Sequence, residues 1–297
     1  LRVWDLMTGE CVRTLEGHAG CVWAIAITPD GRRAVSGGGD RYSASPDYGF
    51  YLWNLETGEC LRTVEGHPGH VNSVAVTPDG GHAVSGSDYR MLRVWDLETG
   101  KCLRTLEGHT GHVNAVGVAP DARRAVSASE DGTLRLWDLA TGQCLKKLEG
   151  HTSWVSAISV TPDGHCAVSG SGDKTLRLWD LATGECLATY EMDGAVTCIA
   201  VHGGMTVVAG GIEGHVHILY LENVTSAPPV CMAWIRSDEE GQAFGCPHCR
   251  VWSEVPEEAL DTELPCPNCG KVVKLNPFVI EADWRPVAAA WRGEVKY

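Results

Sequence analysis

The sequence has no run of 18 apolar residues, and it is poor in positive charge. Lys and Arg together number 24 against 38 Asp and Glu, which gives a formal net charge of −14 at pH 7. A chain without a long apolar run has no candidate for a membrane-spanning helix. An acidic chain repels a phosphate backbone on average, and no basic patch with interleaved aromatic residues appears. We therefore expect neither a nucleic acid nor a membrane as the partner.

The usual signatures of enzymes are also missing. No segment keeps a helical period over more than one turn, and the glycine-rich stretch Ser36–Gly39 belongs to a strand and turn with no helix to follow. There is no lone activated nucleophile and no open metal site. The sequence predicts that the 297 residues are not an enzyme.

A repeated segment dominates what is present. Marker tryptophans stand at intervals of 49, 42, 42 and 42 residues, namely Trp4, Trp53, Trp95, Trp137 and Trp179. Each unit of about forty residues reads as four short strands rich in Val, Leu, Ile and Trp, separated by Pro-Asp, Asp-Gly and Thr-Gly turns. Such a four-stranded antiparallel sheet is apolar on both faces, so it must stack on its copies, and stacked sheets can close into a β-propeller.

Two dipeptides recur with this period. Gly-His begins at 17, 66, 108 and 150, and Trp-Asp begins at 4, 95, 137 and 179. With these dipeptides the chain resembles the WD-repeat (WD40) family over residues 1–236. The resemblance implies an all-β, WD40-type propeller of about 5.5 four-stranded blades. We number the repeats one to six: 1–18 (partial), 19–67, 68–109, 110–151, 152–192 and 193–236.

The first repeat begins on what the register makes the third strand of a blade. We expect an N-terminally truncated ring, with roughly sixty residues missing upstream if the ring has seven blades. The second repeat is longer by 7 residues, and the extra falls in 38–48, where we expect an enlarged surface hairpin.

Each good repeat offers a His, a Ser and an Asp, as a catalytic triad would. A catalytic site is needed once, whereas this set is copied, which favours a packing role. The resemblance implies a structural tetrad in which a buried His bridges the Asp and the Ser, and the Ser meets the indole N–H. The two complete tetrads are His109, Ser127, Asp131 and Trp137, followed by His151, Ser169, Asp173 and Trp179.

Two repeats depart from the tetrad pattern. In the third, Tyr89 stands where the Asp is expected, with Asp88 one position early. In the sixth, Ala209, Glu213 and Leu219 take the Ser, Asp and Trp positions, so we expect this blade to rely on apolar packing and to be the least stable.

The composition changes after the propeller repeats. Cys246-Pro-His-Cys249 and Cys266-Pro-Asn-Cys269 are separated by sixteen residues. This spacing places four thiolates on two turns, as a closed tetrahedral zinc site requires, and residues 241–280 resemble a zinc ribbon. The predicted metal ligands are Cys246, Cys249, Cys266 and Cys269, holding one structural zinc.

Alternatives to zinc stay open. One alternative is a redox dithiol pair, which usually shows a single Cys-x-x-Cys at a helix start rather than two on Pro-containing turns. Another is a rubredoxin-like iron site, which uses the same four cysteine ligands. His248 lies between two ligands and is expected to face solvent. We expect the tail at 281–297, with Trp284, Pro286 and Trp291, to dock on the ribbon or the propeller.

The recurring cysteines Cys11, Cys60, Cys102, Cys144 and Cys186 occupy one equivalent position in successive fourth strands. We interpret them as small buried apolar residues rather than as disulfide halves. With the thiolate site, this predicts a reducing, cytoplasmic location.

Propellers of the resembled family bind other proteins or peptides, so we expect a non-catalytic interaction scaffold. Partner contacts are predicted where the copies differ, near the start of each first strand, at Trp23, His70, Asn72, His112, Asn114 and Trp154. The alternative is a regulatory or substrate-recruiting arm of a larger enzyme or signalling protein whose catalytic domain lies upstream.

Overall fold

The computed structural model describes residues 1–39, 49–64, 66–202, 206–221, 230–235, 242–246, 249, 251–260 and 262–281. For 230–235, 242, 257 and 276–281 it describes the backbone alone. Most of the predicted hairpin insertion at 38–48, namely residues 40–48, lies outside the described residues, as do His248 and the tail tryptophans Trp284 and Trp291. The described residues contain no helix with the length and hydropathy that crossing a bilayer requires.

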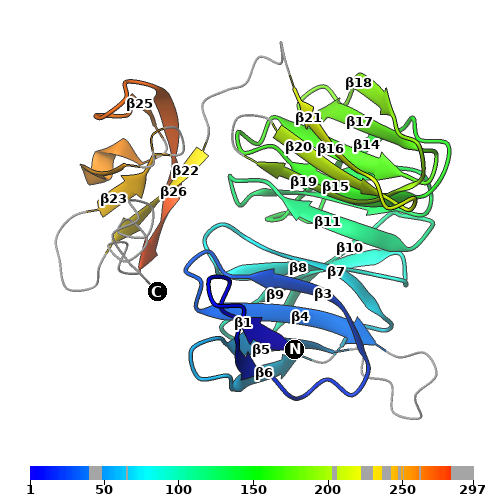
Figure 1. The fold of residues 1–297 in the computed structure, drawn as a ribbon, viewed down its shortest axis with the longest axis horizontal. Helices are drawn as coiled ribbons and strands as arrows, with labels where there is room; N and C mark the ends of the chain where they lie inside the picture. The colour runs from blue at the N-terminus through cyan, green and yellow to red at the C-terminus, as the bar shows by residue number, and fades with distance from the viewer. Residues whose placement is uncertain are drawn as a thin grey trace.

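The predicted four-stranded antiparallel unit is confirmed in repeats two to five (Figure 1). In the fourth repeat, for example, Ser127 pairs with Val116 on one side and with Arg135 on the other. Short strands form here because β-branched and apolar residues alternate between turns. The sixteen strands of these repeats are β3 (Cys21–Ile27), β4 (Arg33–Gly39), β5 (Phe50–Asn54), β6 (Cys60–Val64), β7 (Val71–Val76), β8 (His82–Ser87), β9 (Met91–Asp96), β10 (Cys102–Glu107), β11 (Val113–Val118), β12 (Arg124–Ser129), β13 (Leu134–Asp138), β14 (Cys144–Leu148), β15 (Val155–Val160), β16 (Cys166–Ser171), β17 (Thr175–Asp180) and β18 (Cys186–Glu191).

The first repeat forms the predicted half blade, a two-stranded sheet of β1 (Arg2–Trp4) and β2 (Cys11–Thr14). In the described residues, the sheet of the sixth repeat differs from the expected four-stranded blade and has three strands: β19 (Val196–His202), β20 (Thr206–Gly211) and β21 (Val216–Tyr220).

The boundary drawn at residue 236 needs correction. Strand β22 (Val230–Ile235) does not join the sixth repeat; it pairs antiparallel with β23 (Gln242–Gly245) and parallel with β26 (Val272–Glu281). In this position both edges of β22 are hydrogen-bonded, whereas the outermost strand of a blade has one free edge. The chain therefore passes from the sheet of the sixth repeat to the sheet of the C-terminal module between Tyr220 and Val230.

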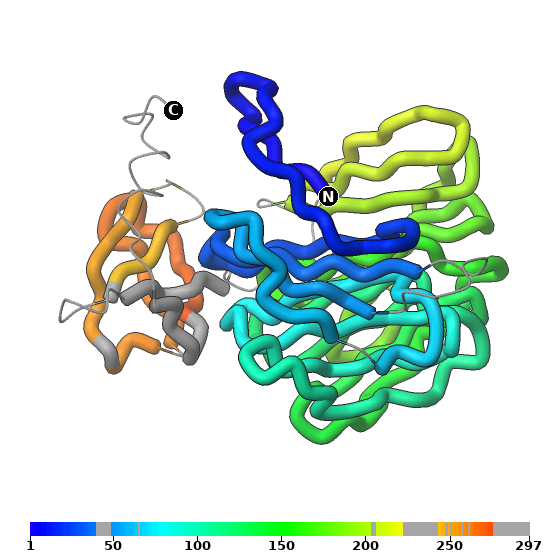
Figure 2. Tube along the Cα trace, turned by 90° about the horizontal axis from the view of Figure 1, so that it is seen from below, coloured from blue at the N-terminus to red at the C-terminus, as the bar shows by residue number. Residues whose placement is uncertain are grey.

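Neighbouring sheets of the repeats pack face to face. The interfaces up to that between the fourth and fifth sheets bury the marker tryptophan of one sheet against apolar residues of the sheet before it, as Trp137 does with Val84 and Leu106. The first strands contact one another along the row, β3 with β7, β7 with β11, β11 with β15 and β15 with β19. Figure 2 follows the chain through this curved row from blue to yellow.

The two ends of the row expose apolar faces. Ile25 is 54% exposed, although it pairs with the tetrad serine of its sheet as Val116 does, and Val116 is 8% exposed. At the other end, Ile218 is 60% exposed, whereas its counterpart Leu178 in the fifth repeat is 5% exposed. The same positions are buried in repeats three to five, where another sheet lies against them, so the exposure marks the ends of the stack.

The C-terminal module is a separate five-stranded sheet in the order β24-β23-β22-β26-β25 and stands beside the propeller sheets in Figure 1. Besides the strands already named, it contains β24 (Trp252–Val255), the short 3-10 helix η1 (Glu257–Ala259) and β25 (Glu263–Pro265). Its small core consists of Phe244, Val255, Val273 and Leu275, together with Cys246 and Cys266.

The prediction of buried cysteines in the fourth strands is wrong. Cys11, Cys60, Cys102, Cys144 and Cys186 are all exposed and free. The fourth strand is the outer edge of each four-stranded sheet, and the residues at its beginning are exposed, as in β10. Repetition at this position therefore reflects equivalent places on the rim and not equivalent places in a core.

Candidate interaction surface and metal centre

The His, Ser, Asp and Trp of the fourth repeat lie together in one hydrogen-bonded chain. His109 places Nδ1 2.8 Å from Asp131 Oδ2 and Nε2 2.7 Å from Ser127 Oγ. Trp137 donates its indole N–H to the same Ser127 oxygen at 2.8 Å. The serine lies on β12, the tryptophan on β13 and the histidine in the loop before β11, so the chain ties the loop to two strands.

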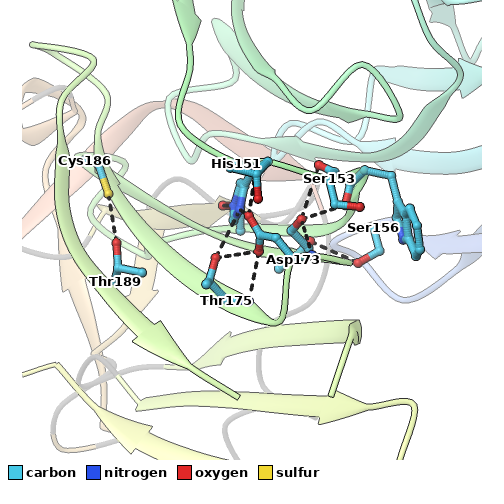
Figure 3. Close-up of polar contacts among 12 residues, drawn as sticks. His151, Ser153, Ser156, Asp173, Thr175, Cys186 and Thr189 are labelled. Carbon is cyan, nitrogen blue, oxygen red and sulfur yellow. Dashed lines mark hydrogen bonds and ion pairs between the residues drawn. The ribbon is translucent and has the colours of Figure 1, made fainter. Parts of the chain in front are cut away.

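The fifth repeat builds the same chain with the same distances. His151 lies 2.8 Å from Asp173 and 2.7 Å from Ser169, and Trp179 donates to Ser169 at 2.8 Å. In Figure 3, His151, Asp173 and Thr175 point toward one another. Burial lowers the pKa of His151 despite the neighbouring carboxylate of Asp173.

The aspartate of this tetrad stays ionised. Burial opposes ionisation of Asp173, but hydrogen bonds from Thr175, the Thr152 backbone N–H and His151 outweigh it and lower its pKa to about 2. Ser127 and Ser169 are fully buried, and each oxygen is already occupied by an imidazole and an indole. A hydroxyl in that position has no access to a substrate, so the geometry is that of a packing device.

The third repeat keeps three members of the tetrad and lacks the acid. His67 Nε2 contacts Ser85 Oγ, and Trp95 donates to Ser85 at 2.8 Å. His67 Nδ1 is buried without a hydrogen-bond partner, because Tyr89 occupies the Asp position. Burial and the Arg93 charge lower the pKa of His67 to about 3. In the second repeat, His18 and Trp53 likewise contact Ser36, at 2.7 and 2.8 Å.

The sixth repeat packs Ala209 and Leu219 against the fifth, in place of Ser and Trp. It also carries a polar contact that sequence reasoning missed. His215 Nδ1 and His217 Nε2 lie 3.4 and 3.6 Å from the same oxygen, Asp193 Oδ2. The signal that could have found it is the His-x-His spacing of His215, just before β21, and His217 within it, which directs both imidazoles to the same side.

Two of the predicted partner contacts have their amides engaged within the molecule. Asn72 Nδ2 donates to the Val113 carbonyl at 3.1 Å, and Asn114 Nδ2 donates to the Val155 carbonyl at 3.0 Å. Both bonds cross from the first strand of one sheet to the first strand of the next. His70 is buried. These three residues lie within the scaffold.

The other three predicted contacts lie at the surface. Trp23 is 64% and Trp154 50% exposed, and His112 is partly exposed, with Nδ1 3.4 Å from Glu130 Oε2. Trp154 borders a hollow of about 520 Å³ between the fourth and fifth sheets. Exposed tryptophans beside a hollow are a common feature of protein-binding surfaces.

The four module cysteines converge on one point. Cys246 Sγ lies 3.8 Å from Cys269 Sγ, Cys249 Sγ lies 3.7 Å from Cys266 Sγ, and all four sulfurs lie within 4.8 Å of one another. Zinc–sulfur bonds of ~2.3 Å in tetrahedral geometry place the sulfurs roughly 3.8 Å apart. A disulfide needs about 2.05 Å, so these are separate thiols arranged with metal-site spacing.

Backbone turns fix this arrangement. The Cys246 N–H donates to the Val251 carbonyl at 3.0 Å, and the Cys266 N–H donates to the Lys271 carbonyl at 2.8 Å. Gly270 adopts a φ of 73°, which favours glycine, and closes the second turn on the Cys266 carbonyl at 2.9 Å. Partial burial raises the pKa of Cys249, but hydrogen bonds from Asn268 and the Val251 backbone outweigh it, leaving a pKa of about 6.

Comparison with known proteins gives a consistent result for the repeats. The family model described as "WD domain, G-beta repeat" matches residues 9–42, 58–96, 100–138 and 142–180, about half of the chain. A nuclear distribution protein PAC1 from Coccidioides posadasii is 49% identical over 41 residues, which is 14% of this chain and 9% of that protein. The PAC1 protein of Arthroderma otae is 50% identical over 40 residues, again 14% and 9%.

The chain thus spans less than a tenth of the length of these curated relatives, about one repeat. Each family-model match, however, begins at the fourth strand of one sheet and continues into the next sheet, and the last three include the buried Trp95, Trp137 and Trp179 with their serine and histidine partners. Sequence period, sheet topology and hydrogen-bonded repeats agree, and the chain belongs to the WD40 repeat family.

Proposed function

We propose that this chain is a non-catalytic protein-interaction scaffold, in which the copied residues hold the sheets together and the residues that differ contact a partner. The observation that carries the proposal is the division between the two sets. The tetrad serines are buried and fully engaged, whereas Trp23, Trp154 and His112 lie at the surface. Exposed tryptophans supply large contact areas at low entropic cost, as hot spots of interfaces do.

The experiment compares capture of binding proteins by the purified chain and by a Trp154→Ala/His112→Ala variant. We expect the variant to lose a protein that the parent captures, with a nearly unchanged melting temperature. Leu145→Ala, an exposed change on the outer rim, is the matched control and should capture normally. Equal capture by the double variant, or a large drop in its melting temperature, would show that these residues are not a partner surface.

We infer further that Cys246, Cys249, Cys266 and Cys269 hold one structural zinc ion. The sulfur spacing of 3.7–3.8 Å supports this. Four thiolates fill the coordination of zinc, so a bound ion would cross-link the two turns and leave no position for a reacting water. A core this small gains most of its folding free energy from the metal, about 10–16 kcal/mol in comparable zinc peptides.

Metal analysis tests the inference. The purified chain should contain about one zinc per chain. Cys266→Ser should lose it, whereas Cys144→Ser, an exposed cysteine of the rim, should retain it. Bound iron and a red colour would show that the site is a rubredoxin-like iron site and not a zinc site. A metal-free protein with a reversible disulfide would indicate a redox pair.

We propose a reducing, cytoplasmic environment. The twelve cysteines whose side chains are described are all free, and five of them lie exposed along the rim. Oxidising compartments convert such exposed thiols to disulfides. Alkylation of the native protein in cell extract should label Cys60 and Cys144 without prior reduction; protection that disappears after reduction would contradict the proposal.

A further inference from the structure

The hollow between the fourth and fifth sheets has an acidic wall and an aromatic wall. Its volume is about 520 Å³. One wall is the turn between β12 and β13, with Glu130, Asp131 and Gly132, and the other is the segment from His151 to Trp154 before β15. The two walls belong to different repeats, so the hollow exists because the sheets are stacked.

The two carboxylates of the acidic wall differ in availability. Asp131 is occupied within the tetrad: Oδ2 accepts from Thr110 N–H and contacts His109, and Oδ1 accepts from Thr133. Glu130 is not part of the tetrad, and its side chain is 48% exposed. Its contact with His112, 3.4 Å away, adds positive charge only when the imidazole is protonated. Glu130 therefore places an exposed carboxyl group at the rim of the hollow.

The aromatic wall is held in place from behind. A Cβ built on Gly172 would lie 2.4 Å from Trp154 Cε2, so the indole rests directly on the backbone of the turn between β16 and β17. The residue remains half exposed. An indole supported on one side and open on the other is the best aromatic platform for a cation.

We propose that this hollow binds the cationic side chain of a Lys or Arg residue in a partner peptide, with Trp154 beneath the charge and Glu130 as its counter-ion. The proposal rests on the proposed scaffold function and specifies the partner of the same surface. None of the described residues that line the hollow is a Lys or Arg, and the chain carries a net charge of −14, so charge complementarity favours a basic partner.

The neighbouring junctions lack this combination. At the position equivalent to Trp154, the sixth repeat has Ala195 and the fourth has His112. The turn equivalent to Glu130–Gly132 contains Lys174 in the fifth repeat and Arg90 in the third, and these cations would repel a basic side chain. Of these three junctions, all within the described residues, the one between the fourth and fifth sheets alone combines an acidic turn without a cation and an exposed tryptophan.

The experiment titrates the full chain with three short capped peptides, Gly-Lys-Gly, Gly-Arg-Gly and Gly-norleucine-Gly, and follows the Trp154 indole N–H by NMR. The resonance is assigned from its loss in Trp154→Leu. We expect the Lys and Arg peptides to shift it saturably and the norleucine peptide to leave it in place. Glu130→Gln should weaken binding of the Lys peptide by roughly three- to tenfold, and raising the salt to 0.5 M should weaken it further.

Trp4→Leu is the matched control, since it removes a half-exposed tryptophan of the first repeat that is not part of the proposed surface, and it should leave the titration unchanged. An equal shift with norleucine, or unchanged Lys affinity in Glu130→Gln with an unchanged melting temperature, would overturn the proposal. Failure here with normal Trp154-dependent capture would remove the cation specificity and leave the scaffold function standing. Failure of both would remove the surface itself.

Discussion

Asn114 donates its side-chain amide to the backbone carbonyl of Val155 at 3.0 Å, and so joins the first strand of one sheet to the first strand of the next. Asn72 makes the same bond to Val113. The sequence shows Asn114 as a residue that differs between copies, which suggested a partner contact. The structure assigns the amide to the junction between sheets.

Replacing Asn114 should therefore affect stability and leave partner capture alone. Asn114→Ala removes the cross-sheet bond, and we expect the free energy of unfolding to fall by about 1 kcal/mol. Urea unfolding measures it, with Thr8→Ala in the exposed first-repeat turn as the control. If the variant has an unchanged free energy of unfolding but fails to capture its partner, Asn114 is a partner contact and not a residue of the sheet junction.

Supplying the acid that the tetrad of the third repeat lacks should make the protein more stable at low pH. Because the pKa of His67 is lowered to about 3, the unfolded chain takes up a proton near pH 6.5 that the folded chain does not. The free energy of unfolding consequently falls as the pH drops from 6.5 toward 3. Tyr89→Asp supplies an acid for Nδ1 and should raise the pKa of His67.

The comparison is the loss of unfolding free energy between pH 7 and pH 5 in the parent and in Tyr89→Asp. We expect the loss to be smaller by about 1–2 kcal/mol in the variant. Asp131→Asn, which removes the acid of the fourth repeat, is the reverse test and should destabilise. Identical pH dependence in the parent and Tyr89→Asp would show that His67 does not titrate as described.

The exposed end face of the sixth repeat should promote association. Ile218→Lys places a charge on this face, so we expect less concentration-dependent association by light scattering and a change in unfolding free energy of under about 0.5 kcal/mol. Leu178→Lys changes the equivalent buried residue and should unfold the protein. Strong destabilisation by Ile218→Lys would mean that the face is covered.

The two classes of cysteine should react at different rates. Burial, together with Asp163 and Asp180, raises the pKa of the Cys166 thiol to about 11, whereas Cys144 is exposed. Since the thiolate is the reactive form, iodoacetamide at pH 8 should label Cys144 well before Cys166. Peptide mapping over time measures the order, and equal rates would contradict the assigned burial.

Features that every repeat shares were predictable from the sequence. Strand order within each sheet follows from period and turn chemistry, because the same local solution is used in each copy. The role of residues such as Ser127 was implied by the resemblance to WD40 repeats. The convergence of Cys246 and Cys269 with their partners follows from spacing alone. These are properties of one repeat or one motif.

Features that depend on where a segment lies among its neighbours were not predictable. Exposure of Cys144 depends on its place on the rim, and the bond from Asn114 depends on the register between two sheets. The position of β22 in the C-terminal module depends on the two strands, β23 and β26, with which it pairs there. Each depends on how segments from different sheets are placed relative to one another, and the pattern within one repeat does not carry this information.

The central claim is that the buried polar residues stabilise the sheets whereas exposed Trp154 serves the surface. Urea unfolding of Ser169→Ala and Trp154→Ala under one condition tests it. Ser169→Ala leaves the His151 imidazole and the Trp179 indole without their shared partner and should lower the unfolding free energy by about 1–3 kcal/mol. Trp154→Ala should lower it by less than about 0.5 kcal/mol. The reverse order, with Ser169→Ala neutral and Trp154→Ala strongly destabilising, would contradict the account.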